Sequence, residues 1–220
     1  MRILRDNGLT IVLSLATFAC LLGMILTGFS VYNQQLAEHG QASISAGQYA
    51  HSGHFLSALF ENWESEFLQM SAYVVLTAFL YQRGSAESKD PDEKTEQDDD
   101  AQRNINRLDA AALVRSGRFL RTLYSYSLGL ALFGLFILSF FLHLWQSAAS
   151  QAADTAMHGR LPLSISSHLA SAQFWFESFQ NWQSEFLSTA VVVVFSIFLR
   201  FKGSPESKPV TALHSETGAR

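Results

Sequence analysis

A nine-residue motif occurs twice in the chain, and each copy is followed by an apolar segment and a second shared signature. The first motif reads FENWESEFL at residues 60–68, and the second reads FQNWQSEFL at residues 179–187. The later signatures, RGSAESK at residues 83–89 and KGSPESK at residues 202–208, are separated by the same spacing as the motifs. The two copies therefore align without a gap, which indicates an internal repeat.

The distribution of charge and apolar residues is typical of a membrane protein. Hydrophobic residues make up 48% of the chain and charged residues 15%, whereas soluble domains average about 25% charged residues. Four apolar segments, at about residues 9–32, 59–81, 123–145 and 179–201, have the ~20 residues that cross a bilayer. The first is not read as a signal peptide because its repeat partner lies in mid-chain. We predict an all-α integral membrane protein with four transmembrane helices in two tandem two-helix repeats.

The repeat also predicts the division of the chain. Residues 1–89 form repeat 1 and residues 108–208 form repeat 2, which begins with a short interfacial helix. Residues 90–107 are strongly charged with few apolar side chains, so we expect an acidic, disordered cytoplasmic linker. Residues 209–220 are expected to be a flexible tail.

The positions of Lys and Arg predict the orientation. With the N-terminus, residues 82–121 and the C-terminal tail on one side, that side holds every Lys and Arg except Arg160. Basic residues mark the cytoplasmic side of a membrane. Both termini are therefore predicted to be cytoplasmic. Because each repeat has two spans, the copies would share one orientation and be related by a pseudo-twofold axis along the membrane normal.

Polar side chains fall near the outer end of the predicted second and fourth spans. Counting about 20 residues back from Tyr81 and Phe201 places Glu66 and Glu185 inside the spans. An ionisable residue at such depth normally faces the protein interior. We therefore predict that the two copies face each other as a paired polar site, which comprises Asn62, Ser65, Glu66, Asn181, Ser184 and Glu185.

The motif tryptophans lie on a neighbouring helical stripe. Trp63 and Trp182 are predicted to be interface anchors, because Trp concentrates at membrane–water interfaces.

Three interpretations of the paired glutamates remain open. They could form buried hydrogen bonds that fix helix register, they could bind an ion or proton, or they could act as catalytic acid and base. The third is the least favoured, because no His or Cys accompanies the motif at metal-ligand spacing. The sequence thus favours a protein that is not an enzyme.

The remaining residues offer little support for a cofactor. His39 and His158 occupy matched His-Gly pairs and are weak metal candidates; polar loop residues are the preferred interpretation, and no metal or cofactor is predicted. Cys20 is the only cysteine, which excludes an internal disulfide. The net charge of −4 gives no reason to expect nucleic acid.

Four segments carry a resemblance to a known family: residues 60–68, 82–91, 179–187 and 203–208. They resemble an uncharacterised bacterial four-span membrane protein family, a domain of unknown function. The likeness covers nearly the whole chain apart from the acidic linker. It implies a multi-pass protein of the bacterial inner membrane, and it transfers no activity and no site residues.

These observations predict an integral inner-membrane protein whose paired motifs have an architectural or interaction role. The alternative is a small ion or proton channel or transporter that uses the paired glutamates. The expected partner is the lipid bilayer; the sequence leaves a homo-oligomer open and does not specify any small-molecule or ion ligand.

Overall fold

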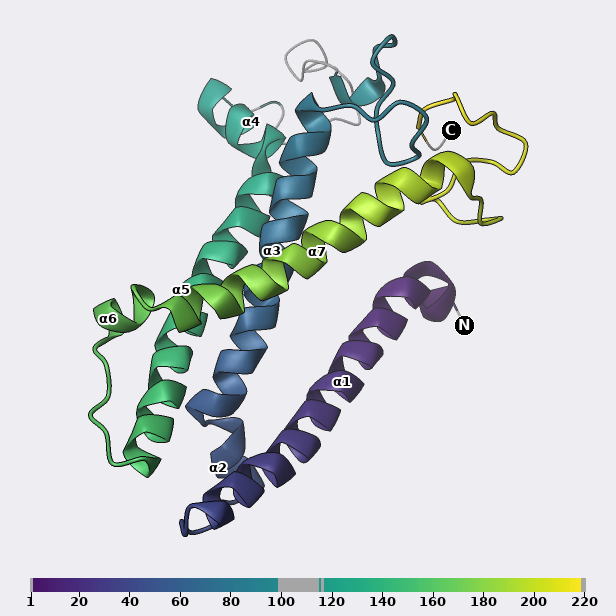
Figure 1. The fold of residues 1–220 in the computed structure, drawn as a ribbon. Coiled ribbons are helices and arrows are strands. Elements are labelled where there is room, and N and C mark those ends of the chain that lie inside the picture. Colours follow the sequence, from purple (N-terminus) through teal and green to yellow (C-terminus); the bar gives the residue numbers. More distant parts are fainter. Residues whose placement is uncertain (1, 99–114, 116, 219–220) are drawn as a thin grey trace. The chain divides into compact units, whose positions relative to one another are not determined.

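The computed structural model describes residues 2–98, 115 and 117–218, and every regular element in these ranges is helical (Figure 1). The long helices are α1 (Arg2–Glu38), α3 (Gly53–Phe79), α5 (Ser127–Met157) and α7 (Ala172–Phe198). Shorter elements are α2 (Ala46–Ala50), the 3-10 turn η1 (Glu96–Asp98), α4 (Arg118–Ser125) and α6 (Ile165–Leu169). The all-α prediction is confirmed. Residues 99–107 of the predicted linker, and residues 108–114 and 116 of the predicted interfacial helix, lie outside the described residues.

Two of the described helices are long and apolar enough to cross a membrane, judged by length and composition. They are Ile3–Glu38, close to the N-terminus, and Ser127–Met157. The segments predicted as the second and fourth spans form α3 and α7, and both helices begin before the acidic motif and include it. In both α3 and α7, the apolar stretch that follows the motif is therefore shorter than the whole helix.

Contacts divide the chain into two compact units. Unit 1 comprises residues 1–60 and 141–174, and unit 2 comprises residues 61–140 and 175–220. Unit 1 contains α1, α2, α6, the first residues of α3 and the C-terminal part of α5. Unit 2 contains most of α3 and α7, the helix α4, the first part of α5 and the segments that follow α3 and α7.

In unit 1, the side chain of Tyr49 fills a space that only glycine leaves open. A Cβ atom placed on Gly28 of α1 would lie 2.2 Å from the Tyr49 hydroxyl oxygen. Tyr49 is buried, its hydroxyl lies 3.1 Å from Nδ1 of His54, and its ring packs against Phe55 with the centroids 5.7 Å apart. Glycine thus allows α1 to approach the segment that leads into α3.

A corresponding cluster in unit 1 connects α5 with α6. Ser147 Oγ lies 2.9 Å from Nε2 of the buried His168. The ring of Phe174 contacts His168 at 5.6 Å and stacks on buried His143 at 5.0 Å. In the repeat alignment, Ser147 matches Gly28, and His168 matches Tyr49. The second copy therefore has a smaller ring and a hydrogen-bonding serine where the first has a tyrosine against glycine.

Matched turns adopt the same backbone geometry in both copies. Gly40 and Gly159 have φ of 68° and 66°, and Gly84 and Gly203 have φ of 85° and 87°. These left-handed values favour glycine. Gly84 and Gly203 lie in a turn several residues beyond Phe79 and Phe198, where α3 and α7 end. The glycines therefore shape the turn after each helix and do not cap its last residue.

In unit 2, α7 crosses α3 (Figure 1), and direct hydrogen bonds join the two helices. Aromatic rings pack beside the crossing: Trp182 lies edge-on to Phe136 of α5 and to Phe179, with centroid distances of 6.2 and 5.5 Å. This packing positions the motif of α7 against the motif of α3.

Candidate functional site along the α3–α7 seam

The motif residues of α3 that are most buried are Glu64 and Ser65, with exposed fractions of 0% and 1%. Asn62, Trp63 and Glu66 are exposed. We call the set of polar contacts between Glu61–Tyr73 of α3 and Asn181–Thr189 of α7 the α3–α7 seam. Glu61, Glu64, Ser65 and Gln69 lie at positions i, i+3, i+4 and i+8, which share one helical face, and Glu66 lies beside this face.

At the motif end of the seam, α7 donates two hydrogen bonds to carboxylates of α3. The amide Nδ2 of Asn181 donates to Oε1 of Glu61. The indole Nε1 of Trp182 donates to Oε1 of Glu64 at 2.9 Å. Since Glu64 is fully buried, the indole satisfies an oxygen that would otherwise be costly to remove from water.

One turn further along, Glu66 and Glu185 bring their carboxyl groups together. The carboxyl group of Glu66 is close enough to that of Glu185 for the two to interact. Two neighbouring carboxylates repel each other when both are ionised, so one proton shared between them stabilises the pair. The pair can therefore hold one proton between matched positions of the two repeats.

The seam continues toward the C-terminal ends of both helices. Nε2 of buried Gln69 donates to Oγ1 of Thr189 at 2.6 Å. Beyond it, the hydroxyl of Tyr73 donates to Oε2 of Glu87 at 2.7 Å. Glu87 lies in the turn that follows α3, so polar contacts run from the motif to that turn.

The turn after α3 is held against α7 by small polar side chains. The hydroxyls of buried Ser85 and Ser196 are 2.9 Å apart, and the backbone N–H of Ala86 donates to Ser196 Oγ at 3.1 Å. Burial raises the pKa of Glu87, and the neighbouring carboxyl group of Glu206 raises it as well, whereas the hydrogen bond from Tyr73 lowers it. A second matched pair of glutamates thus meets at this end.

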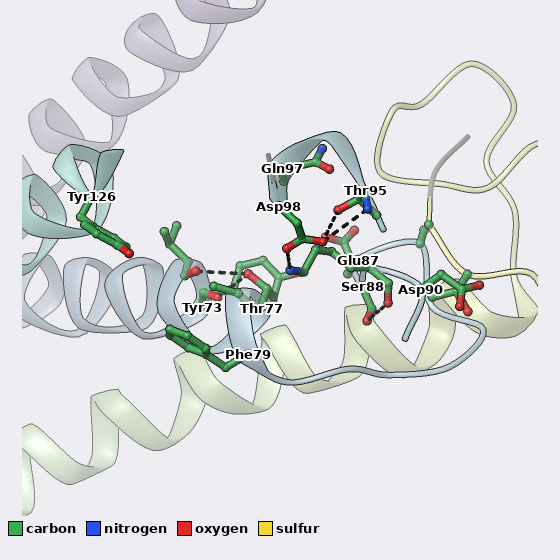
Figure 2. A pocket seen from close by; sticks show the side chains of 16 residues that line it. Tyr73, Thr77, Phe79, Glu87, Ser88, Asp90, Thr95, Gln97, Asp98 and Tyr126 are labelled. Atoms are coloured by element: carbon green, nitrogen blue, oxygen red, sulfur yellow. Dashed lines mark hydrogen bonds and ion pairs between the residues drawn. The ribbon is translucent and has the colours of Figure 1, made fainter. Parts of the chain in front are cut away.

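A cavity of about 720 Å³ opens beside this turn (Figure 2). Its volume is in the range of ligand pockets, about 300–1,000 Å³. Apolar walls include Phe79 of α3 and Tyr126, which lies between α4 and α5, and polar walls come from residues that include Glu87, Lys89 and Asp98. The Lys89 ammonium contacts Asp98 at 2.5 Å. A smaller cavity of about 240 Å³ shares Tyr73, Thr77, Glu87 and Ser88 with it.

Hydrogen bonds join the segment after α7, which is part of the predicted tail at residues 209–220, to the turn that follows α3. Within the described part, the ammonium of Lys208 lies within hydrogen-bond distance of four backbone carbonyls, and the hydroxyl of Thr217 accepts from the N–H of Gly84 at 2.9 Å. Lys208 is 1% exposed. The sequence holds no signal for this contact, because the acceptors are main-chain atoms.

The predicted paired site is brought together only in part. Glu66 and Glu185 interact, and Asn181 bonds to α3. The serines bond their own helices instead: Ser65 Oγ donates to the carbonyl of Asn62 at 2.9 Å, and Ser184 Oγ donates to that of Asn181 at 2.8 Å. The residues that make contacts between α3 and α7 therefore differ from the set of six that the sequence predicted.

The two motif tryptophans have different surroundings. Trp63 is 41% exposed, whereas Trp182 is partly buried and is a hydrogen-bond donor of the seam.

Sequence reasoning missed Glu61, Glu64, Gln69 and Thr189. It weighted residues that are identical in both copies, whereas Glu61 and Glu64 align with Gln180 and Gln183. The helical spacing of polar residues at 61, 64, 65 and 69 was the signal that could have identified this face.

Two of the histidines lie close together. The rings of His39 and His158, in unit 1, have centroids 5.1 Å apart. Each Nδ1 lies within 2.9 Å of a backbone carbonyl of the helix that precedes it, from Gln35 and Asp154 respectively. No group of three or more His, Cys, Asp or Glu side chains that could hold a metal occurs in the described ranges.

The fold and the site define an all-helical protein with two helices able to cross a membrane and a polar seam between two copies of one motif. The chain belongs to the family described as Domain of unknown function (DUF6766), whose model matches residues 1–219. The match to a family of unknown function agrees with the resemblance drawn from the repeated motifs. No curated protein and no solved structure is significantly similar to the chain.

Proposed function

We propose that this protein is a four-span integral protein of the bacterial inner membrane with both termini in the cytoplasm, in which α3 and α7 are the second and fourth spans. The α3–α7 seam has an architectural role: it joins the two repeats about a pseudo-twofold axis. The observation that carries the proposal is the pair of hydrogen bonds from Asn181 and Trp182 to the carboxylates of Glu61 and Glu64.

The environment of the long helices supports membrane insertion. The sequences of α1 and α5 are long and apolar enough to span a bilayer. Large apolar side chains are exposed along them, such as Phe18 on α1 and Phe141 on α5. Lipid would cover such surfaces, which soluble monomers rarely expose as large contiguous patches.

An architectural role follows from the cost of polar groups in lipid. A carboxylate at membrane depth needs a partner, and hydrogen bonds between spans then fix the register of the helices. Glu64 obtains such a partner from Trp182, on the other copy of the motif. A single register therefore satisfies the buried carboxylate.

The variant Trp182→Phe tests this role because it keeps an aromatic ring and removes the indole donor. We expect a lower midpoint of thermal unfolding in detergent than for the wild type, since loss of one partner of a buried group costs about 1–3 kcal/mol. Trp145→Phe is the matched control, because Trp145 is 62% exposed. Equal midpoints for all three proteins would contradict the architectural role at this contact.

A proton or ion path is the second candidate function, and the contact between Glu66 and Glu185 favours it. A carboxyl pair that shares a proton can take up and release it. Gln69, Tyr73 and Glu87 continue the row of polar groups toward the cytoplasmic end. Ion or proton flux into proteoliposomes containing the double variant Glu66→Gln, Glu185→Gln tests this candidate.

Retained folding with reduced flux would support conduction, whereas reduced thermal stability without any wild-type flux would support the architectural role alone. Glu38→Gln serves as the control, since Glu38 is exposed at the end of α1. If the double variant matches the wild type in both flux and stability, neither role applies to this pair.

A further inference from the structure

Residues 209–218, here called the C-terminal strap, run from α7 back to the turn that follows α3. Nζ of Lys208, directly before the strap, lies 2.5 Å from the carbonyl oxygen of Gly84 and within hydrogen-bond distance of three carbonyls of the strap, so its three N–H donors are shared among four acceptors. These three belong to Leu213, His214 and Glu216, at 3.1, 3.1 and 2.8 Å. One ammonium thus bridges the strap and the turn of the other repeat.

The surroundings of Lys208 make it an unusual lysine. Lysine side chains are almost never fully buried unless they are paired, yet Lys208 is 1% exposed. Its partners are four carbonyl oxygens, which compensate the charge as the oxygen ligands of a bound cation do. The carbonyls form a binding site for a primary ammonium group, and the chain fills that site with its own side chain.

Further hydrogen bonds extend the contact along the strap. The N–H of Gly218 donates to the carbonyl of Ser85 at 2.9 Å, next to the bond between Gly84 and Thr217. At the other end, Nη2 of Arg200 donates to the carbonyl of Ala212 at 3.1 Å. Both ends of the strap are therefore attached, one to the turn after α3 and one to the end of α7.

The strap also forms part of the wall of the 720 Å³ cavity. Thr217 and Gly218 line that cavity together with Tyr73 and Glu87, whose labelled side chains appear in Figure 2. Displacement of the strap would remove this wall and expose the carboxyl group of Glu87, one oxygen of which is now shielded from solvent.

We propose that the four carbonyls are a primary-ammonium site, that Lys208 occupies it to hold the strap closed, and that release of Lys208 opens the cavity at Glu87. The proposal goes beyond the function proposed above, because it requires neither an architectural nor a conducting seam.

The test compares the full-length wild type with Lys208→Ala, using two measurements. Hydrogen exchange reports on the strap, and we expect the Gly218 amide to exchange about tenfold faster or more in the variant, because its hydrogen bond would open more often. Amidation of Glu87 by a water-soluble carbodiimide and an amine, followed by mass spectrometry, reports on cavity access and should increase. Glu38, which is exposed at the end of α1, is the internal reference.

Chemical rescue makes the test specific for the ammonium site. Propylammonium replaces the atoms that Lys208→Ala removes, so it should restore slow exchange and low labelling. Tetramethylammonium carries the same charge without an N–H donor and should not. Lys202→Ala is the matched control, because Lys202 is an exposed lysine in the same segment after α7.

Three results would overturn the proposal: wild-type exchange in Lys208→Ala, rescue by tetramethylammonium equal to that by propylammonium, or unchanged labelling of Glu87 despite faster exchange. If Lys208→Ala does not fold, hydrogen exchange of the wild-type protein alone tests the proposal. An exchange rate at Gly218 equal to that of an unstructured peptide would then show that the strap is not closed.

Discussion

At the scale of single residues, the fit between Gly28 and Tyr49 shows how one missing side chain can determine a helix contact. Alanine usually stabilises a helix interior relative to glycine by about 0.5–1 kcal/mol. At Gly28 the added Cβ would meet the Tyr49 hydroxyl at 2.2 Å. Tyr49 cannot easily retreat, because it is buried and bound to His54. The steric cost should therefore exceed the gain in helix propensity.

We predict that Gly28→Ala lowers the thermal unfolding midpoint in detergent. Gly23→Ala is the control on the same helix: no described atom lies within 4 Å of a Cβ at that position, so its midpoint should stay the same or rise. A Gly28→Ala protein as stable as Gly23→Ala would contradict the contact. The companion variant Tyr49→Phe should reduce the penalty of Gly28→Ala, since it removes the atom that the Cβ meets.

The carboxyl group of Glu87 gives a second prediction at the same scale, on pH dependence. Its pKa is raised in the folded protein, chiefly by burial. The folded state therefore favours the protonated form. This contribution to stability is complete below the ordinary pKa of glutamic acid, about 4.3, and is lost as the pH rises through the raised pKa.

The unfolding midpoint of the wild type should consequently fall more steeply than that of Glu87→Gln as the pH rises above that ordinary value. The groups that face Glu87 are Tyr73 and Glu206, so Glu206→Gln should weaken the effect without removing it. Glu38→Gln should follow the wild type. If the unfolding midpoints of the wild type and Glu87→Gln change in parallel with pH, Glu87 is not held in its protonated form.

At the scale of elements, hydropathy predicts the presence of the long helices but not where they end. The helix α1 continues to Glu38 and α5 to Met157, beyond the apolar segments, because polar turns can extend a helix past a bilayer-length run. The break at Tyr126 between α4 and α5 has no proline or glycine signal. The caps at Ser45 and Ser164 accept hydrogen bonds from Gln48 and Ser167 and match in position, as a repeat implies.

The sequence could identify the site residues that are identical in both repeats. Glu66 and Glu185 are identical in both copies, and they do meet. The buried Glu64 aligns with a glutamine, so a comparison of identical residues in the two copies does not identify it. The four carbonyl partners of Lys208 depend on the conformation of the strap, which no side-chain pattern encodes. Contacts that use main-chain atoms are thus the part of the site that the sequence does not reveal.

At the scale of the whole molecule, two models of topology place the same residues on different sides of the membrane. If all four long helices cross, Gln41 and Leu161 lie outside, and Pro91 and Lys202 lie inside. If α1 and α5 alone cross, Pro91 lies outside with Gln41, and Leu161 lies inside with Lys202. Pro91 and Leu161 therefore distinguish the models, whereas Gln41 and Lys202 serve as references.

Single cysteines at these four exposed positions, in a Cys20→Ser background, can be labelled in intact spheroplasts with a maleimide that does not cross membranes. We expect labelling of Gln41→Cys and Leu161→Cys, and labelling of Pro91→Cys and Lys202→Cys only after lysis. Four spans are favoured because they place every Lys and Arg except Arg160 on the cytoplasmic side. Labelling of Pro91→Cys together with protection of Leu161→Cys would establish two spans, and α3 and α7 would then lie outside the bilayer with their carboxylates in water.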